Sequence, residues 1–420
     1  MLVLGSHDLS GAPIVVVGAG AAGTMAAIHA AGAGARVLLV EGTKDGGRKI
    51  LISGGGRCNV LPSRAQPERF VTASSPNSMR RLLRSWPLDE QRSFFENRLG
   101  LPLRLEPETG KLFPVSNRAR DVRDGLLALA RDLGVEVRFE ARVADVCRSR
   151  DGAAGWNVMV DGGSTIAARA VILASGGLSV PQTGSDGAGL AIARRLGHTI
   201  HDTYPALTPL TAEPPVHASL AGVSLEVSIE APLPKGRFST TGGFLFTHRG
   251  YSGPAVLDAS HLAVQSRERT ERQCLLVRWT ELDREGWDRT LIGSAGGATV
   301  GSIVRRAMPT RLADVLIAHA DVDAARPLAE LRREERARLV QALAAYPLPW
   351  TGDEGYRKAE VTGGGVALEE IDPRTMESRV QPGLFLCGEI LDAFGPIGGH
   401  NFTWAWSTGR AAGSGAARPS

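Results

Sequence analysis

The sequence predicts an α/β fold in which one parallel-sheet domain is split by a long insertion. Two short β-branched runs, residues 13–17 and 36–40, flank an alanine-rich helical stretch. This pattern is typical of a strand–helix–strand unit with parallel strands. Residues 200–260 are instead rich in Pro, Gly and Thr, and a pattern typical of alternating strands and helices returns after residue 360. We therefore predict that the residues between these two parts form an insertion that splits the parallel-sheet domain.

Hydrophobic periodicity predicts the remaining elements. Continuous apolar runs predict further buried strands at 135–139, 170–174 and 383–389. Apolar residues at helical spacing predict helices over 21–33, 78–99, 121–133, 188–196, 301–320, 328–345 and 403–411. Short alternating runs predict strands at 223–229 and 244–246. We therefore expect the sheet domain at 1–199 and 357–420, an inserted β-rich domain at 200–268 and 341–356, and a helical subdomain at 269–340.

Composition narrows the functional class. The chain has 420 residues, with 48 basic against 44 acidic residues spread along it, which is poor evidence for nucleic acid binding. Four cysteines stand far apart with no C-x-x-C pair, so neither a disulfide framework nor a metal site is expected. No signal peptide and no apolar run of about 18 residues is found, so we expect a cytoplasmic protein without a membrane span.

A glycine turn after the first strand carries the strongest chemical signal. Gly18, Gly20 and Gly23 form a G-x-G-x-x-G at the start of the first helix, and Glu41 follows at the end of the second strand. Gly18 permits the tight turn, Gly20 lets the backbone approach a pyrophosphate, and Gly23 allows close helix–strand packing. The helix N-terminus favours phosphate, and the Glu41 carboxylate can accept hydrogen bonds from a ribose. The motif predicts a dinucleotide site but does not separate FAD from NAD.

A second glycine-rich loop, residues 46–59, makes a family resemblance specific. The strings VVVGAGAAG (15–23) and GRKILISGGGRCN (47–59) resemble the YhiN/BaiN-like family of bacterial flavoproteins, which are aminoacetone-oxidase-like, NAD(P)/FAD-dependent oxidoreductases. The stretches 173–189, 246–257 and 359–413 resemble the same family. The resemblance implies a Rossmann-like FAD-binding domain split by an inserted β-barrel-like unit and a small helical unit, and it implies FAD as the cofactor.

The resemblance, together with the glycine turn, also implies the residues that would contact FAD. Gly388 and Glu389 match the turn that reaches the ribityl and pyrophosphate region, and the start of the last helix falls where the flavin ring is approached. The expected cofactor residues are Gly18, Gly20, Ala21, Ala22, Gly23, Glu41, Gly42, Arg48, Lys49, Gly54, Gly55, Arg57, Cys58, Asn59, Val143, Ala174, Ser175, Gly176, Gly388, Glu389, Gly398, Gly399, His400 and Asn401.

The catalytic step is less defined by the sequence. His248, Tyr251 and His400 are candidate proton donors, because hydride addition to a polarised double bond requires a positioned acid. Cys58 lacks a nearby partner for dithiol chemistry. No second G-x-G-x-x-G is present, so NAD(P)H would act only as a transient reductant.

We expect an FAD-dependent oxidoreductase of a small organic substrate bound between the two domains. An RNA-associated flavoprotein is the alternative, motivated by arginines near Arg305, Arg332 and Arg338.

Overall fold

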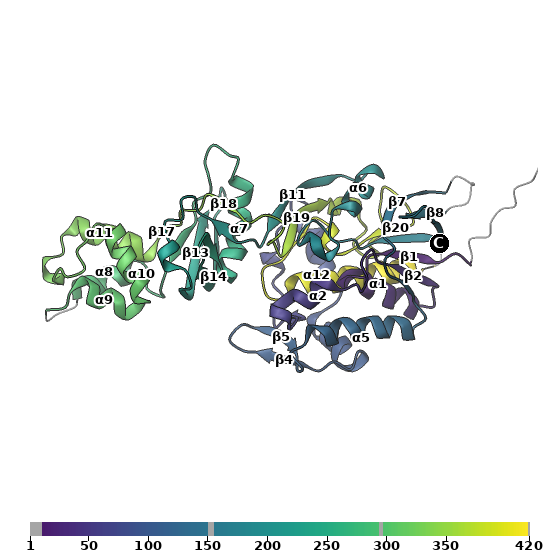
Figure 1. Cartoon of the computed structure of the whole chain (residues 1–420), viewed down its shortest axis with the longest axis horizontal. Helices are drawn as coiled ribbons and strands as arrows, with labels where there is room; N and C mark the ends of the chain where they lie inside the picture. Colours follow the sequence, from purple (N-terminus) through teal and green to yellow (C-terminus); the bar gives the residue numbers. More distant parts are fainter. Residues whose placement is uncertain (1–10, 150–154, 294–296, 419–420) are drawn as a thin grey trace, which may run out of the picture. The chain divides into compact units, whose positions relative to one another are not determined.

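The computed structural model describes residues 11–149, 155–293 and 297–418, which form two compact units (Figure 1). Unit 1 comprises the described residues up to Tyr204 and from Val361 onward, and unit 2 runs from Pro205 to Glu360. The chain leaves unit 1 along strand β11 (Ile200–Ala206) and returns along β19 (Val361–Val366), and these two strands pair with each other. The observed architecture is therefore the predicted one, an α/β domain interrupted by an insertion.

A parallel sheet of five strands lies at the centre of unit 1. Its order is β20-β10-β1-β2-β6, with bounds Leu384–Leu386, Ala170–Leu173, Ile14–Val17, Val37–Val40 and Glu136–Arg138. The register pairs Val16 with Ile172 on one side and with Leu39 on the other. Every side chain of β1, β2 and β10 is buried, which explains why these strands read as continuous apolar runs.

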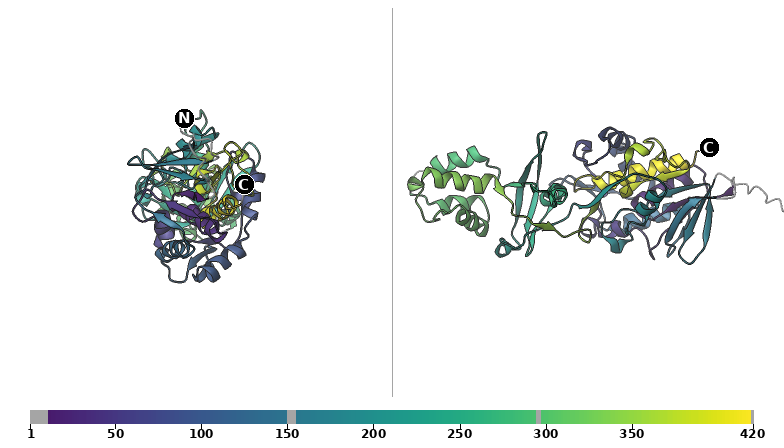
Figure 2. Two further views of the ribbon diagram at one scale, coloured as in Figure 1. Left: turned by 90° about the vertical axis from the view of Figure 1, so that its right-hand side faces the viewer. Right: turned by 90° about the horizontal axis from the view of Figure 1, so that it is seen from above.

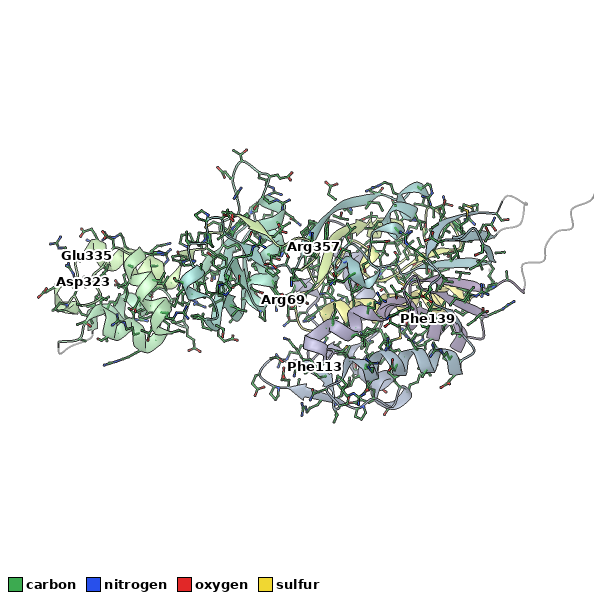
Figure 3. All side chains as sticks on the ribbon, in the orientation of Figure 1. Arg69, Phe113, Phe139, Asp323, Glu335 and Arg357 are labelled. Carbon is green, nitrogen blue, oxygen red and sulfur yellow. The ribbon has the colours of Figure 1, made fainter. Side chains whose placement is uncertain are left out.

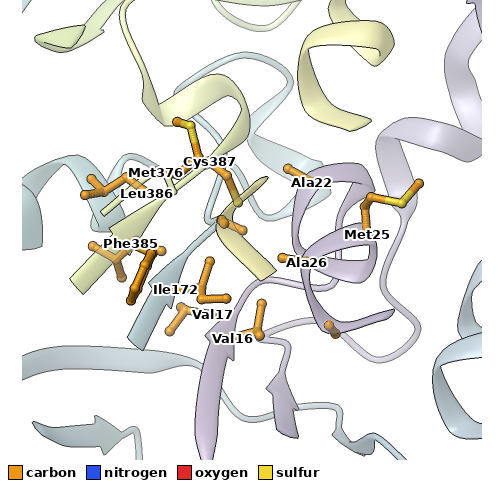
Figure 4. Packing of buried hydrophobic residues seen from close by; sticks show 14 of the residues in the cluster. Val16, Val17, Ala22, Met25, Ala26, Ile172, Met376, Phe385, Leu386 and Cys387 are labelled. Carbon is orange, nitrogen blue, oxygen red and sulfur yellow. The ribbon is translucent and has the colours of Figure 1, made fainter. Parts of the chain in front are cut away.

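Helices α1 (Ala21–Gly32) and α12 (His400–Ala416) pack against each other (Figure 1). Figure 4 shows Ala22 and Ala26 of α1 beside the sheet residues Val16, Val17 and Ile172. The approach is close because α12 presents glycines to α1. A Cβ added at Gly409 would lie 2.4 Å from the Ala22 carbonyl oxygen, and one at Gly413 would lie 2.1 Å from that of Ala26. Helix α12 begins at His400 and not at 403, directly after Gly399, whose φ of 95° is a conformation that glycine adopts without steric cost.

Further helices and two small antiparallel sheets complete unit 1. The helix expected over 78–99 is wrong as a single element, because Pro87 divides it into α3 (Pro76–Arg84) and α4 (Leu88–Ser93), which runs on into a π-helical turn, Phe94–Arg98. The other helices are α2 (Arg48–Ile52), α5 (Ala119–Asp132) and α6 (Ala188–Arg195). The small sheets have the orders β3-β5-β4 (Leu61–Pro62, Lys111–Pro114, Leu103–Glu106) and β7-β8-β9 (Val143–Arg148, Trp156–Val160, Thr165–Ala168).

Unit 2 combines a seven-stranded sheet with helices around a second hydrophobic core. The sheet order is β17-β16-β13-β14-β15-β12-β18, with bounds Tyr346–Pro347, Leu276–Arg278, Ser224–Pro232, Arg237–Phe246, Gly250–Ser252, Leu210–Thr211 and Gly352–Asp353. In Figure 2 the green helices lie beside the teal strands. These helices are α8 (Arg284–Gly293), α9 (Val300–Ala307), α10 (Thr310–His319) and α11 (Arg333–Ala344).

Three features of unit 2 differ from the sequence expectation. The segment 269–340, expected to be helical, also supplies strand β16. A 13-residue helix, α7 (Pro254–Ser266), follows strand β15 within the stretch expected to be β-rich. The single helix expected over 301–320 is two helices, α9 and α10, because Pro309 lies at their junction. No helix among the described residues is both long and apolar enough to cross a membrane.

Candidate functional site

Four loops of unit 1 meet at the carboxyl edge of the parallel sheet. They follow β1, β2, β10 and β20, and because these strands are parallel their carboxyl ends lie on one side. These loops and the first turn of α1 carry half of the predicted cofactor residues: Gly18, Gly20, Ala21, Ala22, Gly23, Glu41, Gly42, Ala174, Ser175, Gly176, Gly388 and Glu389. Ligands of open α/β sheets bind in the crevice at this edge.

The three glycines of the first loop have different surroundings. Gly18 has φ +99°, and a Cβ there would lie 2.6 Å from the Ala174 carbonyl oxygen. A Cβ at Gly23 would lie only 1.9 Å from the Gly18 carbonyl oxygen, so Gly23 is required by helix–strand packing. A Cβ at Gly20 would meet no atom within 4 Å. Gly20 therefore borders open space at the N-terminus of α1, as expected if the pyrophosphate of a dinucleotide passes over it.

The N-terminus of α1 is suited to an anion. Gly20 caps the helix without a side-chain hydrogen bond, and the first turn contains no acidic residue. The Glu41 carboxylate closes the same corner, since its Oε2 accepts a hydrogen bond from Ala19 N at 2.7 Å and its Oε1 accepts one from Thr43 N at 2.8 Å. Free helix N–H groups beside a fixed carboxylate fit the pyrophosphate and ribose of an adenine dinucleotide.

A partly buried ionic cluster surrounds Glu389 beside β20. Lys49 Nζ lies 2.5 Å from Glu389 Oε2 and 2.6 Å from the Ser179 hydroxyl, which itself donates to Glu389 Oε1. Thr362 adds its backbone N–H and its hydroxyl to Oε1, each at 3.0 Å. Lys49 and Glu389 were predicted, whereas Ser179 and Thr362 were missed. The sequence indicates these two missed residues only weakly, because Ser179 lies in one of the stretches that resemble the family and Thr362 precedes three glycines.

A second uncapped helix N-terminus lies in the loop before α12. Gly398 and Gly399 have φ values of +113° and +95°, and α12 has neither a side-chain cap nor an acidic residue in its first turn. The Asn401 side chain holds the loop, because it donates to the Gly395 carbonyl and accepts from the Gly395 N–H, both at 2.9 Å. A fixed, uncapped helix of this length can stabilise negative charge on a flavin pyrimidine.

The His400 ring lies on the side of this helix that packs against Phe70. The two rings meet edge to face with centroids 6.1 Å apart, and His400 is 6% exposed. Burial, assisted by the positive charge of Arg69, lowers the pKa of His400 to about 4. Its imidazole is therefore neutral near pH 7.

The residues of the glycine-rich loop divide into two groups. Gly54 and Gly55 are exposed with positive φ, and Asn59 is half-buried beside Gly54. Two of the predicted cations are held by other protein groups. Arg48 pairs with Asp45 at 2.8 Å, and Arg57 pairs with Glu106 at 3.0 Å while lying over the Phe113 ring, labelled in Figure 3. Both guanidinium groups are therefore already paired with carboxylates of the protein itself.

Cys58 and Val143 are both buried. Burial raises the pKa of the Cys58 thiol to about 12, so the thiol stays protonated and a poor nucleophile. Val143 begins β7, the first strand of the three-stranded sheet β7-β8-β9, and pairs with Val160.

Gly388 has φ +80°, and a Cβ there would lie 2.7 Å from that of Ala22 on α1. This glycine therefore lets the β20 turn approach α1.

The two remaining candidates, His248 and Tyr251, belong to unit 2. His248 is exposed in the turn between β14 and β15, whereas Tyr251 is fully buried in β15. The Tyr251 hydroxyl bonds His217 Nδ1 at 2.8 Å, and His217 Nε2 bonds the Tyr346 hydroxyl at 3.1 Å. The Tyr346 hydroxyl also bonds Nδ1 of the exposed His319 at 2.9 Å. Tyr251 thus ends a hydrogen-bonded chain that reaches the surface of unit 2.

Comparison with known proteins identifies the family. The family model described as the HI0933-like protein Rossmann domain matches residues 12–415. A ribosomal RNA dihydrouridine synthase from Escherichia coli is 32% identical over 399 residues, covering 94% of this chain and 95% of that protein. A 3-dehydro-bile acid delta(4,6)-reductase from Clostridium scindens is 32% identical over 412 residues, covering 96% and 98%.

A solved structure supports the fold. The 3-ketosteroid-delta4-(5alpha)-dehydrogenase from Rhodococcus jostii, in complex with 4-androstene-3,17-dione, has a TM-score of 0.52 and 16% identity, covering 99% of each chain. The resemblance to the YhiN/BaiN-like flavoproteins and the expected split Rossmann-like fold are thereby confirmed. The chain belongs to the HI0933-like Rossmann-domain family and is an FAD-dependent oxidoreductase.

Proposed function

We propose that this oxidoreductase reduces a carbon–carbon double bond conjugated to a carbonyl group. The observation that carries the proposal is the shared chemistry named for two relatives matched over nearly their whole length. A dihydrouridine synthase saturates a uracil double bond next to a carbonyl, and a delta(4,6)-reductase of a 3-dehydro acid acts on double bonds conjugated to a ketone. The substrates differ in size, but the reacting groups are alike.

The residues at the sheet edge would hold FAD in an extended form. The N–H groups of Ala21 and Ala22 at the start of α1 would bind the pyrophosphate, with Gly20 leaving room for it. Glu41 would bind the adenine ribose, and Glu389, fixed by Lys49, would bind the ribityl hydroxyls. Bound FAD supplies hydride transfer, which this reduction requires. NAD(P)H would serve as a transient reductant, since the sequence has one dinucleotide fingerprint.

His248 is the proton donor that we favour. Reduction of a polarised double bond adds a proton as well as a hydride, so a side chain must deliver that proton. His248 is exposed, whereas the Tyr251 hydroxyl is engaged by His217 inside the core of unit 2. His400 is disfavoured, because its lowered pKa of about 4 leaves it neutral at pH 7. A neutral imidazole is a poor acid.

Stopped-flow spectroscopy of the FAD-loaded protein tests the proposal. The flavin is first reduced anaerobically with NADH or NADPH, and its reoxidation is then followed with a 3-oxo-4-ene steroid and with the saturated ketone. We expect reoxidation by the enone alone. His248→Ala should keep FAD bound and slow reoxidation at least about tenfold. Equal rates with both ketones would exclude double-bond reduction, and an unchanged rate in the variant would exclude His248.

Reduction of uridine in ribosomal RNA is the second candidate. Two relatives carry that activity in their names, from Escherichia coli and, at 31% identity, from Haemophilus influenzae. The arginines that motivated an RNA hypothesis support it weakly. Arg305 pairs with Asp314 at 2.7 Å, and Arg338 donates to the Ala320 carbonyl at 2.8 Å. Mass spectrometry of ribosomal RNA incubated with the reduced protein tests this candidate, because dihydrouridine is expected only if uridine in RNA is a substrate.

A further inference from the structure

A cavity of about 250 Å³ lies in unit 1 between α3, the start of α4 and α12. Its lining runs from exposed residues, Ala65 and Arg84, to buried ones, so the cavity leads inward from the surface. Most of the wall is apolar, with Phe70, Leu83 and Trp86 contributing large surfaces. We call this cavity the α3–α12 pocket. A dry apolar cavity of roughly 150 Å³ already binds benzene, so this one has room for a two-ring ligand.

The aromatic wall of the pocket is fixed by neighbouring groups. The Trp86 ring meets the Phe94 ring edge to face with centroids 5.6 Å apart, and the Arg410 guanidinium lies 5.2 Å from the Trp86 centroid. Phe70 is held between His400 and Trp404. A wall that does not rearrange lowers the entropic cost of ligand binding.

One buried polar atom in the lining has no partner among the described residues. The Gln91 side chain is 0% exposed, and its Nε2 donates to the Trp86 carbonyl at 2.7 Å and to the Ser407 hydroxyl at 3.2 Å. The carbonyl acceptor on Trp86 fixes which end of the amide is nitrogen. Gln91 Oε1 is then left without a donor. Such an atom is costly to bury. Because Gln91 has no exposed surface, its amide would have to turn toward the cavity for an O–H or N–H group of a ligand to satisfy it.

The mouth of the pocket carries positive charge. Arg84 is the charged side chain of the lining, and it forms no ion pair with any residue that the structure describes. Arg80 and Arg81 stand on the same helix, which has no acidic residue. An anionic group at the mouth would form a charge-assisted hydrogen bond with Arg84.

We propose that the α3–α12 pocket binds a small amphipathic organic anion: an apolar ring system inside, a hydroxyl group donating to Gln91 Oε1, and a carboxylate at Arg84. Among the predicted cofactor residues the lining includes only His400. The site therefore does not depend on the reaction proposed above. A ligand in it would contact the first turn of α12, the helix predicted to face the flavin.

Calorimetric titration of the FAD-loaded full-length protein with 6-hydroxy-2-naphthoate tests this site. We expect saturable binding. Removing the carboxylate (2-naphthol) or the hydroxyl (2-naphthoate) should weaken it, each by about tenfold or more, the effect of one lost hydrogen bond to a charged or buried group. Arg84→Glu should weaken binding of the acid to the same extent. The matched control Arg81→Glu lies exposed on α3 outside the lining and should bind normally.

A blocking variant separates this pocket from any other site. Ala65 is exposed at the mouth, so Ala65→Trp should leave the fold and the flavin content unchanged and abolish binding. Ala33→Trp, at an exposed position after α1, is the control. Absence of binding at millimolar concentration, or equal binding to the Ala65 variant and the wild type, would overturn the site. Equal effects of Arg84→Glu and Arg81→Glu would show that Arg84 does not bind the carboxylate of the ligand.

Discussion

Gly20 and Gly23 stand in one turn of the chain but serve different purposes. A Cβ at Gly23 would overlap the Gly18 carbonyl oxygen at 1.9 Å, whereas one at Gly20 would enter empty space. Gly20 also has φ −80°, which any residue can adopt. The fold therefore requires glycine at position 23, and only a ligand would require it at position 20.

This difference predicts opposite phenotypes for two valine variants. Gly20→Val should fold with a free energy of unfolding within about 1 kcal/mol of the wild-type apoprotein, since it changes only a helix cap, and should retain less than about a tenth of the flavin. Gly23→Val should lose at least about 3 kcal/mol of stability even without flavin. Flavin absorbance after purification and urea denaturation of the apoproteins measure both effects. Stoichiometric flavin in Gly20→Val would contradict this assignment of the pyrophosphate site.

Residue type and spacing predicted the glycine turn of the candidate site but not the partners of its cations. The glycine turn is local, so its conformation follows from adjacent residues. Whether Arg57 faces a ligand depends on Glu106 and Phe113, which come from a hairpin about fifty residues away. Ser179 and Thr362 reach Glu389 from separate parts of the chain for the same reason. Such partners are set by tertiary packing, which periodicity does not encode.

Among the secondary-structure elements of unit 1, helices α1 and α12 pack closely against each other. Gly409 and Gly413 bring the backbones into contact, and a side chain at either position would overlap a carbonyl oxygen of α1. Glycine is unfavourable inside a helix by about 1 kcal/mol relative to alanine, so its use twice on one face indicates that the close approach outweighs that cost.

A substitution on this face should separate the two helices. Gly413→Leu places atoms within 2.1 Å of the Ala26 carbonyl oxygen, and we expect a loss of about 3 kcal/mol or more in the free energy of unfolding. We also expect lower flavin content, because α1 carries the proposed pyrophosphate site. Ser414→Ala, the next residue on the less buried side, should change stability by less than about 0.5 kcal/mol. Urea denaturation checks both values. Equal stability of the two variants would mean that the helices can move apart freely.

The elements that the sequence predicted well are those buried on all sides. Strands β1, β2 and β10 read as apolar runs because both of their faces are covered. Helix α7 was missed because its small residues, such as Ala255 and Ala259, lie in a stretch dominated by turn residues and strands. Proline divided two helices whose apolar spacing continued across the break, at Pro87 and at Pro309.

At the scale of the whole molecule, each of the two units holds histidines that are buried or half-buried. Burial lowers the pKa of four of them to about 4: His29 and His400 in unit 1, and His217 and His261 in unit 2. For His217 the charge of His319 adds to the effect of burial. Since the unfolded chain titrates these groups near 6.5, the unfolded state binds more protons between about pH 4 and about pH 6.5.

Both units should therefore lose stability as the pH falls from about 6.5 to about 4. Each histidine contributes up to about 3 kcal/mol over this window, of which about 2 kcal/mol is lost between about pH 7 and about pH 5. His217→Asn removes one titrating group, so unit 2 of this variant should lose about 2 kcal/mol less than the wild type on acidification to about pH 5. His248→Asn, at an exposed position, should behave like the wild type. Urea denaturation followed by pulse proteolysis, with fragments assigned to each unit, measures the two units separately. An identical pH dependence in the His217 variant and the wild type would show that the loss arises elsewhere.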